Sequence, residues 1–253
     1  MSEYVDNLIS VITPTYNSEA FIEKTMESVR QQTYSNWEMV IVDDGSTDDT
    51  ISIIQKYQEQ DERIKFIQLT ENQGAAIARN TAIEHAKGRF IAFLDSDDQW
   101  MPEKLEEQLA FMQENDIAFS YTGYQELYED EEKGNVITAP QKADYPQLLK
   151  NCVIGCLTVI IDRYKTGKLQ MVNIRSRQDY ALWLELTRKG YIAYGLDRVL
   201  SLYRVREQSI SSNKIKMAKQ NWYVYRNVEK LGFFKSVWYF IQYAYFKIRK
   251  YIV

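Results

Sequence analysis

Hydrophobic and polar positions follow two different periods along the first hundred residues. Short, continuous apolar runs are typical of strands buried on both faces, and they occupy residues 8–13, 39–42, 64–69 and 90–94. Between these runs, apolar residues recur at helical spacing over residues 20–32, 50–58 and 74–86. Strands that alternate with helices predict a mostly parallel, doubly wound α/β sheet, with right-handed crossovers and helices on both faces.

The second hundred residues follow a less regular pattern. Pro102 can open a helix whose apolar stripe is Leu105, Leu109 and Met112. Further elements are expected as extended chain over 117–128, a charged turn over 130–135, a strand over 155–161, a helix over 179–188, and two short strands around Asp197 within 192–203. We expect one domain with a first half (1–100) and a second half (101–212), followed by a helical tail (213–253).

Acidic residues gather where three of the predicted strands end. They are Asp43, Asp44, Asp95, Asp97 and Asp98. In open α/β sheets, ligands bind beyond the carboxyl ends of the strands, so these side chains are expected to meet in one crevice. Carboxylates so close together repel one another unless a cation is present, and they are the hard oxygen ligands that suit Mg²⁺ or Mn²⁺.

Each acidic cluster also has a purely structural interpretation. The stretch from Asp44 to Asp48 (DGSTD) is an ordinary turn, and Ser46, Thr47 or Asp48 can cap the next helix. The spacing of Asp95 and Asp97 occurs often by chance. The combination at successive strand ends is more specific than either cluster alone.

Composition narrows the class of protein. The chain has 253 residues, 45% of them hydrophobic and 26% charged, which is typical of a globular protein. Two cysteines, Cys152 and Cys156, and one histidine, His85, exclude a disulfide framework and a Cys/His zinc site. Residues 1–7 are polar and acidic, unlike a secretory signal, and no apolar run reaches membrane-spanning length, so we expect a cytoplasmic location.

Six ordered motifs resemble those of the inverting family 2 glycosyltransferases, whose nucleotide-sugar-binding fold is called GT-A. They are SVITPTYN (10–17), VDDGSTD (42–48), NQGAAIARN (72–80), GRFIAFLDSDD (88–98), QDYALWL (178–184) and LYRVR (202–206). Within that family, the chain looks most like Gram-positive enzymes that build cell-wall or capsular polymers such as teichuronic acid.

The resemblance implies roles for individual residues. Nucleotide-binding residues would be Pro14, Thr15, Tyr16, Asp44, Arg79, Asp95 and Ser96. Among them, Asp44 would accept a hydrogen bond from the uracil N3–H, which favours a UDP-sugar. Asp97, with Asp95, would hold Mn²⁺ or Mg²⁺, and Asp179 would be the catalytic base that deprotonates the acceptor hydroxyl.

Three of the family positions keep a second interpretation. Asp179 precedes an apolar helix and would also serve as its N-cap. Trp183 would stack on an acceptor sugar or pack in the core. Arg206 stands where the family often has histidine, so it would clamp the diphosphate without coordinating metal, or it is a surface arginine.

The tail differs in charge from the rest of the chain. Residues 214–253 hold nine of the 31 Lys and Arg residues and a single acid, Glu229. Residues 233–253 place seven apolar side chains near one helical face: Phe234, Val237, Trp238, Ile241, Tyr245, Ile248 and Ile252. This pattern predicts contact with the inner face of a membrane, with packing on the body or a homodimer contact as alternatives. The acidic remainder argues against nucleic acid.

We therefore expect an inverting glycosyltransferase that moves a sugar from a UDP-sugar to a glycan or lipid-linked acceptor. The alternatives are a sugar-1-phosphate nucleotidyltransferase and a non-catalytic sugar-nucleotide-binding protein. Nucleotidyltransferases usually carry a glycine-rich basic loop near their start, and residues 8–20 contain no glycine, lysine or arginine.

Overall fold

The computed structural model describes residues 4–206 and 214–249. The expected boundary between body and tail, at residues 212 and 213, and the last residues of the tail, 250–253, lie outside the described residues. In the first half, strands and helices alternate as expected: β1 (Val5–Thr15), α1 (Ile22–Arg30), β2 (Trp37–Asp43), α2 (Thr50–Gln60), β3 (Ile64–Gln68), α3 (Ala75–His85) and β4 (Gly88–Phe93).

The second half adds shorter elements and one long strand. They are β5 (Gln99–Trp100), α4 (Lys104–Glu114), β6 (Phe119–Leu127), β7 (Lys133–Ile137), β8 (Lys142–Ala143), α5 (Tyr145–Lys150), the 3₁₀ helix η1 (Cys156–Thr158), β9 (Ile160–Asp162), α6 (Arg163–Thr166), α7 (Gln178–Arg188) and β10 (Ala193–Arg204).

Two of the predicted strands are wrong in detail. The run 155–161 contains η1, because Thr158 donates from its backbone N–H and its hydroxyl to the Gly155 carbonyl, and the strand β9 begins only at Ile160. The segment 192–203 is one strand, β10, and not two. The interruption expected around Asp197 is a bulge, since the pairing with β6 passes directly from Leu196 to Val199.

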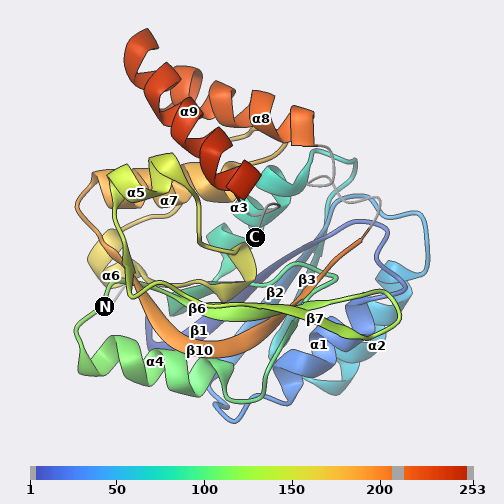
Figure 1. The fold of residues 1–253 in the computed structure, drawn as a ribbon. Helices are drawn as coiled ribbons and strands as arrows, with labels where there is room; N and C mark the ends of the chain where they lie inside the picture. Colours follow the sequence, from blue (N-terminus) through green and yellow to red (C-terminus); the bar gives the residue numbers. More distant parts are fainter. Residues whose placement is uncertain (1–3, 207–213, 250–253) are drawn as a thin grey trace.

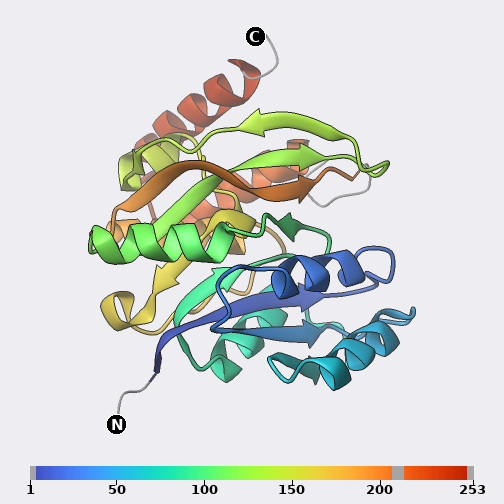
Figure 2. The same cartoon turned by 90° about the horizontal axis from the view of Figure 1, so that it is seen from below.

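The strands form one twisted sheet in the order β3-β2-β1-β4-β9-β6-β10-β5, with β7 paired to β6 and β8 to β10 (Figures 1 and 2). The pairs β1–β2, β1–β4, β2–β3 and β6–β10 are parallel. Strand β9 is antiparallel to both β4 and β6 and so joins the two halves. The predicted doubly wound α/β fold is confirmed.

Alternate residues of the central strands enter two separate cores. On β4, Phe90 and Ala92 belong to the core under α1, α2 and α4, whereas Ile91 and Phe93 belong to the core under α3, α5 and α7. Because side chains alternate between faces and both faces are covered, successive positions from Phe90 to Phe93 of β4 are all apolar. This explains the continuous apolar runs in the sequence.

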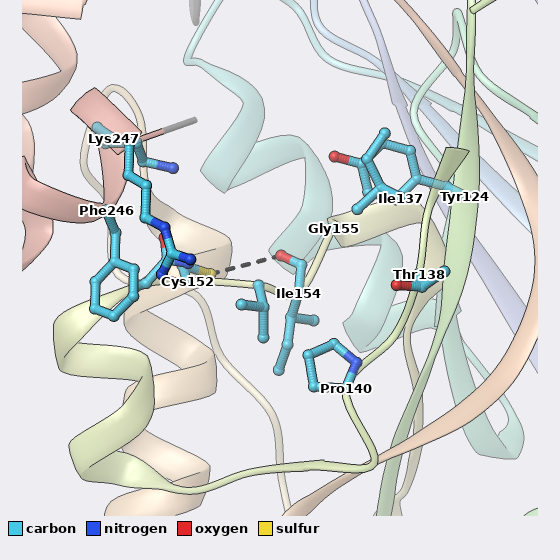
Figure 3. Close-up of a pocket in the computed structure, with 12 residues that line it drawn as sticks. Tyr124, Ile137, Thr138, Pro140, Cys152, Ile154, Gly155, Phe246 and Lys247 are labelled. Carbon is cyan, nitrogen blue, oxygen red and sulfur yellow. Dashed lines mark hydrogen bonds between the residues drawn. The ribbon is translucent and has the colours of Figure 1, made fainter. Parts of the chain in front are cut away.

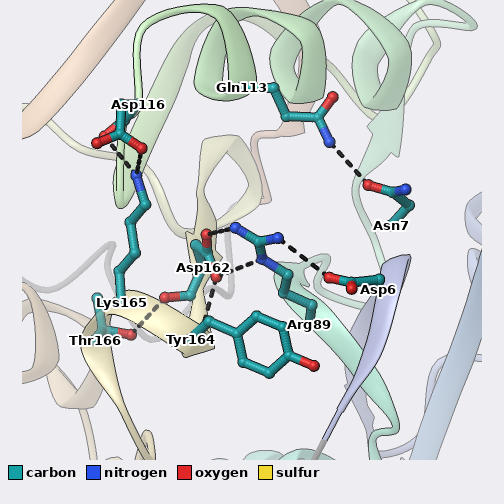
Figure 4. A network of polar contacts seen from close by, with 9 residues as sticks. All are labelled: Asp6, Asn7, Arg89, Gln113, Asp116, Asp162, Tyr164, Lys165 and Thr166. Atoms are coloured by element: carbon teal, nitrogen blue, oxygen red, sulfur yellow. Dashed lines mark hydrogen bonds and ion pairs between the residues drawn. The ribbon is translucent and has the colours of Figure 1, made fainter. Parts of the chain in front are cut away.

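A network of polar contacts connects β1, β4, β9 and α6 at the edge of the sheet where β1 and β4 begin (Figure 4). The buried Asp162 accepts two hydrogen bonds from Arg89, at 3.0 and 2.7 Å, and caps α6 through the Tyr164 N–H. Arg89 also reaches Asp6 at the start of β1. These contacts fasten β9 and α6 to the first half of the sheet.

The tail consists of α8 (Lys214–Tyr223), a π-helical turn (Val224–Val228) and α9 (Phe233–Arg249). It lies over α5 and α7 (Figure 1). Val224 and Tyr225 are buried in the core, and the Tyr225 hydroxyl donates to the Leu149 carbonyl. The Glu229 carboxylate accepts hydrogen bonds from Tyr145 (2.7 Å) and Arg188 (3.2 Å). One side of the tail thus packs on the body.

Candidate active site

A cavity of about 710 Å³ opens at the carboxyl ends of β1, β2 and β4. Every residue expected to bind nucleotide or metal lines it, together with Arg206: Pro14, Thr15, Tyr16, Asp44, Arg79, Asp95, Ser96 and Asp97. Three of the five acids expected to meet there, Asp44, Asp95 and Asp97, line this cavity, whereas Asp43 and Asp98 do not. The cavity is also lined by residues 72–76, from the loop before α3 and the start of α3, and by residues 173–175, from the loop before α7.

Asp44 organises the loop that precedes α3. Its two carboxylate oxygens accept the backbone N–H groups of Gln73 (2.7 Å) and Gly74 (2.8 Å). Gly74 has φ +95°, a conformation that favours glycine, and it leads directly into α3. An ionised carboxylate has about four lone-pair sites, so Asp44 retains acceptor capacity toward the cavity.

The neighbouring Asp43 has a structural role. It is fully buried and accepts hydrogen bonds from the Gly45 N–H (3.1 Å) and from the Ser46 N–H (2.9 Å) and hydroxyl. Asp48 in turn accepts the Thr50 N–H at the start of α2. The N-cap of α2 is Asp49, which has no side-chain capping bond, so none of the three residues expected to cap this helix is its N-cap. Asp44 alone of this motif lines the cavity.

Two ion pairs hold the aspartates that follow β4. The buried Arg79 donates to Asp95 at 2.5 Å, and Arg206 donates to Asp97 at 3.2 Å. Burial and the charge of Asp95 raise the pKa of Asp97, and Arg206 opposes this shift. Burial, with the charges of Asp97 and Asp95, also raises the pKa of Asp98 well above its usual value. A cation at this cluster would relieve the repulsion among these carboxylates.

A second cavity, of about 500 Å³, adjoins the first, and Arg79, Asp95, Asp97, Arg175 and Arg206 line both. Asp179 lies in its wall, in the first turn of α7. The N-cap of α7 is Arg177, which has no side-chain capping bond, so the capping interpretation of Asp179 is wrong. Asp179 is partly exposed and lines this cavity together with Asp95, Asp97 and Asp98.

Trp183 corrects another expectation. Its side chain is 0% exposed and packs against Phe93 and Phe119, with ring centroids 5.6 and 5.2 Å away. It lies one helical turn beyond Asp179, on the face of α7 that covers the sheet. A buried indole presents no face to a sugar, so Trp183 belongs to the core and not to an acceptor site.

Several cavity residues were not anticipated from the sequence. Arg175 lines both cavities, and Arg177 lines the second with Met217 of α8. Arg177 has φ +70°, a strained value for a residue with a side chain, and its guanidinium donates to the Tyr243 hydroxyl of α9 at 3.3 Å. The sequence RSRQD (175–179) could have indicated these residues, since it places two arginines just before the candidate base.

The aspartates fit a divalent cation that is completed by a substrate. Asp95 and Asp97 line one cavity and interact electrostatically. In the part of the chain that the structure describes, no three His, Cys, Asp or Glu side chains gather as a metal-binding group. Mg²⁺ and similar ions are often held by one or two carboxylates plus substrate phosphates, which is what this donor set offers.

Comparison with known proteins assigns the family. The model named "Glycosyl transferase family 2" matches residues 10–167. TuaG of Bacillus subtilis, whose name places it in teichuronic acid biosynthesis, is 53% identical over 96% of this chain and 97% of its own length. WfgD of Escherichia coli, a UDP-Glc:α-D-GlcNAc-diphosphoundecaprenol β-1,3-glucosyltransferase, is 44% identical over 86% and 85%.

Solved structures share the fold. Residues 1–349 of S. aureus TarS, in complex with UDP, superpose with a TM-score of 0.67 at 23% identity, covering 93% of this chain and 70% of that one. The motifs, the α/β fold and the match over 10–167 agree with one another. The chain is a glycosyltransferase that belongs to glycosyltransferase family 2.

Proposed function

We propose that the protein moves a sugar from a UDP-sugar to a glycan or lipid-linked acceptor, with inversion, during synthesis of a cell-surface polysaccharide. The observation that carries this proposal is the pair of adjoining cavities. One brings together the expected nucleotide residues, and the other holds Asp179, with Asp95 and Asp97 in the wall between them.

The names of relatives support the choice of substrates. TuaG is named for teichuronic acid biosynthesis, and WfgD for glucosyl transfer from UDP-Glc to a sugar on diphosphoundecaprenol. Both are similar to this chain over most of its length, which favours a uridine donor and a cell-surface product. Family membership also favours glycosyl transfer over the nucleotidyltransferase and non-catalytic alternatives.

Asp179 acts as the base in this proposal. Its carboxylate takes the proton of the acceptor hydroxyl as that oxygen forms a bond to the anomeric carbon of the donor. The bond from that carbon to the diphosphate oxygen breaks, and its electron pair leaves with UDP. Attack from the face opposite the diphosphate inverts the anomeric centre, so no covalent enzyme intermediate is needed.

Two arginines and a bound metal ion would stabilise the leaving diphosphate. Arg175 and Arg206 line both cavities, so their guanidinium groups can bind the phosphate oxygens. Asp97, with Asp95, would hold Mn²⁺ or Mg²⁺. When bound, such an ion supplies Lewis-acid stabilisation of the charge that grows on the diphosphate.

The tail supports contact with an anionic membrane surface. Phe234, Trp238, Ile241, Tyr245 and Ile248 follow one another every three or four residues on α9, and each is more than half exposed. Lys216, Lys219, Lys235 and Arg249 are also exposed on α8 and α9. In residues 4–206 and 214–249, no helix has the length and hydropathy to cross a bilayer. An exposed aromatic stripe with nearby cations is typical of interfacial helices.

Thermal melting with nucleotides tests the donor site. UDP with Mn²⁺ is expected to raise the Tm of the wild type, whereas GDP, ADP and CDP raise it less, because a ligand that binds only the folded state stabilises it. At 100 times its Kd, UDP adds about 2.7 kcal/mol. No shift with any nucleotide would contradict the proposal.

Two variants test whether Asp97 binds the metal. Asp97→Asn should lose the additional shift that Mn²⁺ gives to UDP. Asp61→Asn, a carboxylate paired with Arg63 outside both cavities, is the matched control and should keep that shift. An equal metal effect in both variants would exclude Asp97 as a metal ligand.

A further inference from the structure

A third cavity of about 500 Å³ continues from the second toward the end of α9 (Figure 3). Tyr124, Cys152, Ile154 and Gly155 line both, so the two spaces share a wall. None of its lining residues belongs to the nucleotide cavity. It therefore lies on the Asp179 side of the site, where a donor nucleotide would not extend.

The lining of this cavity combines an apolar surface with positive charge. Ile137 and Pro140 face Ile154 across it, and Phe246 and Lys247 enter from α9 (Figure 3). Arg249 contributes a second cation. Among the described residues that line it, none is acidic, whereas Asp44, Asp95 and Asp97 line the nucleotide cavity. An anion with an apolar attachment complements such a surface.

The same turns of α9 carry the exposed stripe. Tyr245 and Ile248 alternate with Phe246, Lys247 and Arg249, so the groove opens beside the surface proposed to meet the membrane. A molecule anchored in a bilayer by an apolar chain would reach the groove from this side. Its charged linkage would then lie at the cations and its sugar toward Asp179.

We propose that Lys247 and Arg249 bind the phosphate or diphosphate that links the acceptor sugar to its lipid, and that this groove is the acceptor's entrance. The inference rests on the proposed function, because it takes the second cavity as the site of transfer. It makes α9 a part of the substrate-binding surface as well as a membrane contact. Cations in the last turn of a helix also stabilise the helix dipole, so the test needs a readout of binding.

Geranyl diphosphate is the probe, because it carries a diphosphate on a short apolar chain and contains no sugar. Protein is first saturated with UDP and Mn²⁺ to fill the donor site, and binding is followed by calorimetry without lipid. Wild type should bind saturably and prefer geranyl diphosphate to geraniol. The variant Lys247→Gln/Arg249→Gln should bind about tenfold or more weakly, and Lys247→Arg/Arg249→Lys should recover most of the affinity.

Matched controls make the outcome specific. Lys219→Gln/Lys235→Gln removes two exposed cations of the tail that do not line the groove and should leave the affinity unchanged. Equal affinity in wild type and Lys247→Gln/Arg249→Gln would overturn the inference. The inference would also be overturned if Lys247→Gln/Arg249→Gln bound anionic vesicles less well but geranyl diphosphate as well as wild type does. The two cations would then bind lipid headgroups.

The donor site gives the independent readout. All variants should keep the Tm increase with UDP and Mn²⁺, which also shows that they fold. If wild type fails to bind UDP, the proposed function fails, and the experiment is repeated without nucleotide. Loss of geranyl diphosphate binding in the groove variant alone would still support the anion site.

Discussion

Carboxylates close together in the sequence have different tasks in this protein because their surroundings differ. Asp43 and Asp44 are adjacent, yet Asp43 closes a turn while Asp44 holds the loop before α3 and lines the nucleotide cavity. Asp97 pairs with Arg206, whereas Asp98 is buried and accepts the Arg204 N–H at 2.8 Å. The residue type alone predicts the chemistry, and hydrogen-bond partners decide which carboxylate remains available for it.

Replacing Asp179 by Asn tests the base. The amide keeps the shape of the side chain but does not accept the hydroxyl proton, so kcat should fall by about 10²–10⁴-fold. The KM for the UDP-sugar should change little, because Asp179 does not line the nucleotide cavity. Steady-state kinetics measures both, with the exposed Asp197→Asn as control. A variant with undiminished kcat would exclude Asp179 as the base.

A buried lysine should make stability depend on pH. Lys104 is fully buried, donates to Gln108 and Thr158, and burial lowers its pKa to about 7. In the unfolded chain its pKa is about 10.4, so between these values the unfolded state binds more protons. The free energy of unfolding should therefore rise with pH over this range, by up to about 1.4 kcal/mol per pH unit. Below pH 7 the lysine is protonated in both states, so its contribution to the free energy of unfolding no longer changes with pH.

Lys104→Met removes this ionisable group while keeping similar volume. Urea denaturation of both proteins at pH 7, 8 and 9 gives the difference in their unfolding free energies. That difference should change with pH in favour of the wild type as pH rises. A difference that is constant across the range would mean that Lys104 is protonated in the folded protein.

At the scale of secondary structure, the spacing of apolar residues predicts an element well where successive turns or residue pairs of that element have the same environment. The apolar runs of β1, β2 and β4 were identified because both faces of these strands are covered. Strand β10 was misjudged because a bulge and a turn carry the same polar signal. The burial of Trp183 was equally undecided in the sequence, since the helical period shows a stripe but not what lies under it.

The docking of the tail depends on a buried carboxylate. The side chain of Glu229 is 1% exposed and accepts from Tyr145 and Arg188. Glu229→Ala removes both hydrogen bonds; water can replace the acceptor of the half-exposed Arg188, but the part-buried Tyr145 hydroxyl loses its partner, at a cost of about 1–3 kcal/mol. Amide hydrogen exchange should accelerate about tenfold or more in α9 and remain unchanged in β1 and β4.

Glu185→Ala, which removes a more exposed pair with Lys189, should leave α9 unaffected. Unchanged exchange in Glu229→Ala would show that other contacts hold the tail.

At the scale of the whole molecule, charge and apolar surface are separated. The segment 214–253 is strongly basic, and the rest of the chain has 34 acids against 22 Lys and Arg residues. The acidic body would be repelled by an anionic bilayer and the tail attracted, at about 1 kcal/mol per basic residue near the surface. This polarity would orient the protein with α9 toward the membrane.

Vesicle flotation tests this orientation. Wild type should bind vesicles that contain anionic lipid, bind neutral vesicles less, and be released as salt rises, because screening weakens the attraction. Trp238→Gln/Ile241→Gln should weaken binding several-fold, since both side chains are more than half exposed on α9. Val136→Gln, an exposed apolar residue of β7, should bind as wild type does. If Trp238→Gln/Ile241→Gln instead abolishes self-association, the stripe is a contact between two copies.

The sequence by itself determined the alternating first half, the strand-end aspartates and the family. These follow from local periods and from short motifs whose residues lie near one another in the chain. Only the tertiary structure decided that Trp183 is core and that Arg177 contacts α9. It also decided that α9 packs on one side and leaves an apolar stripe on the other. Such facts depend on contacts between distant segments, and no local pattern carries them.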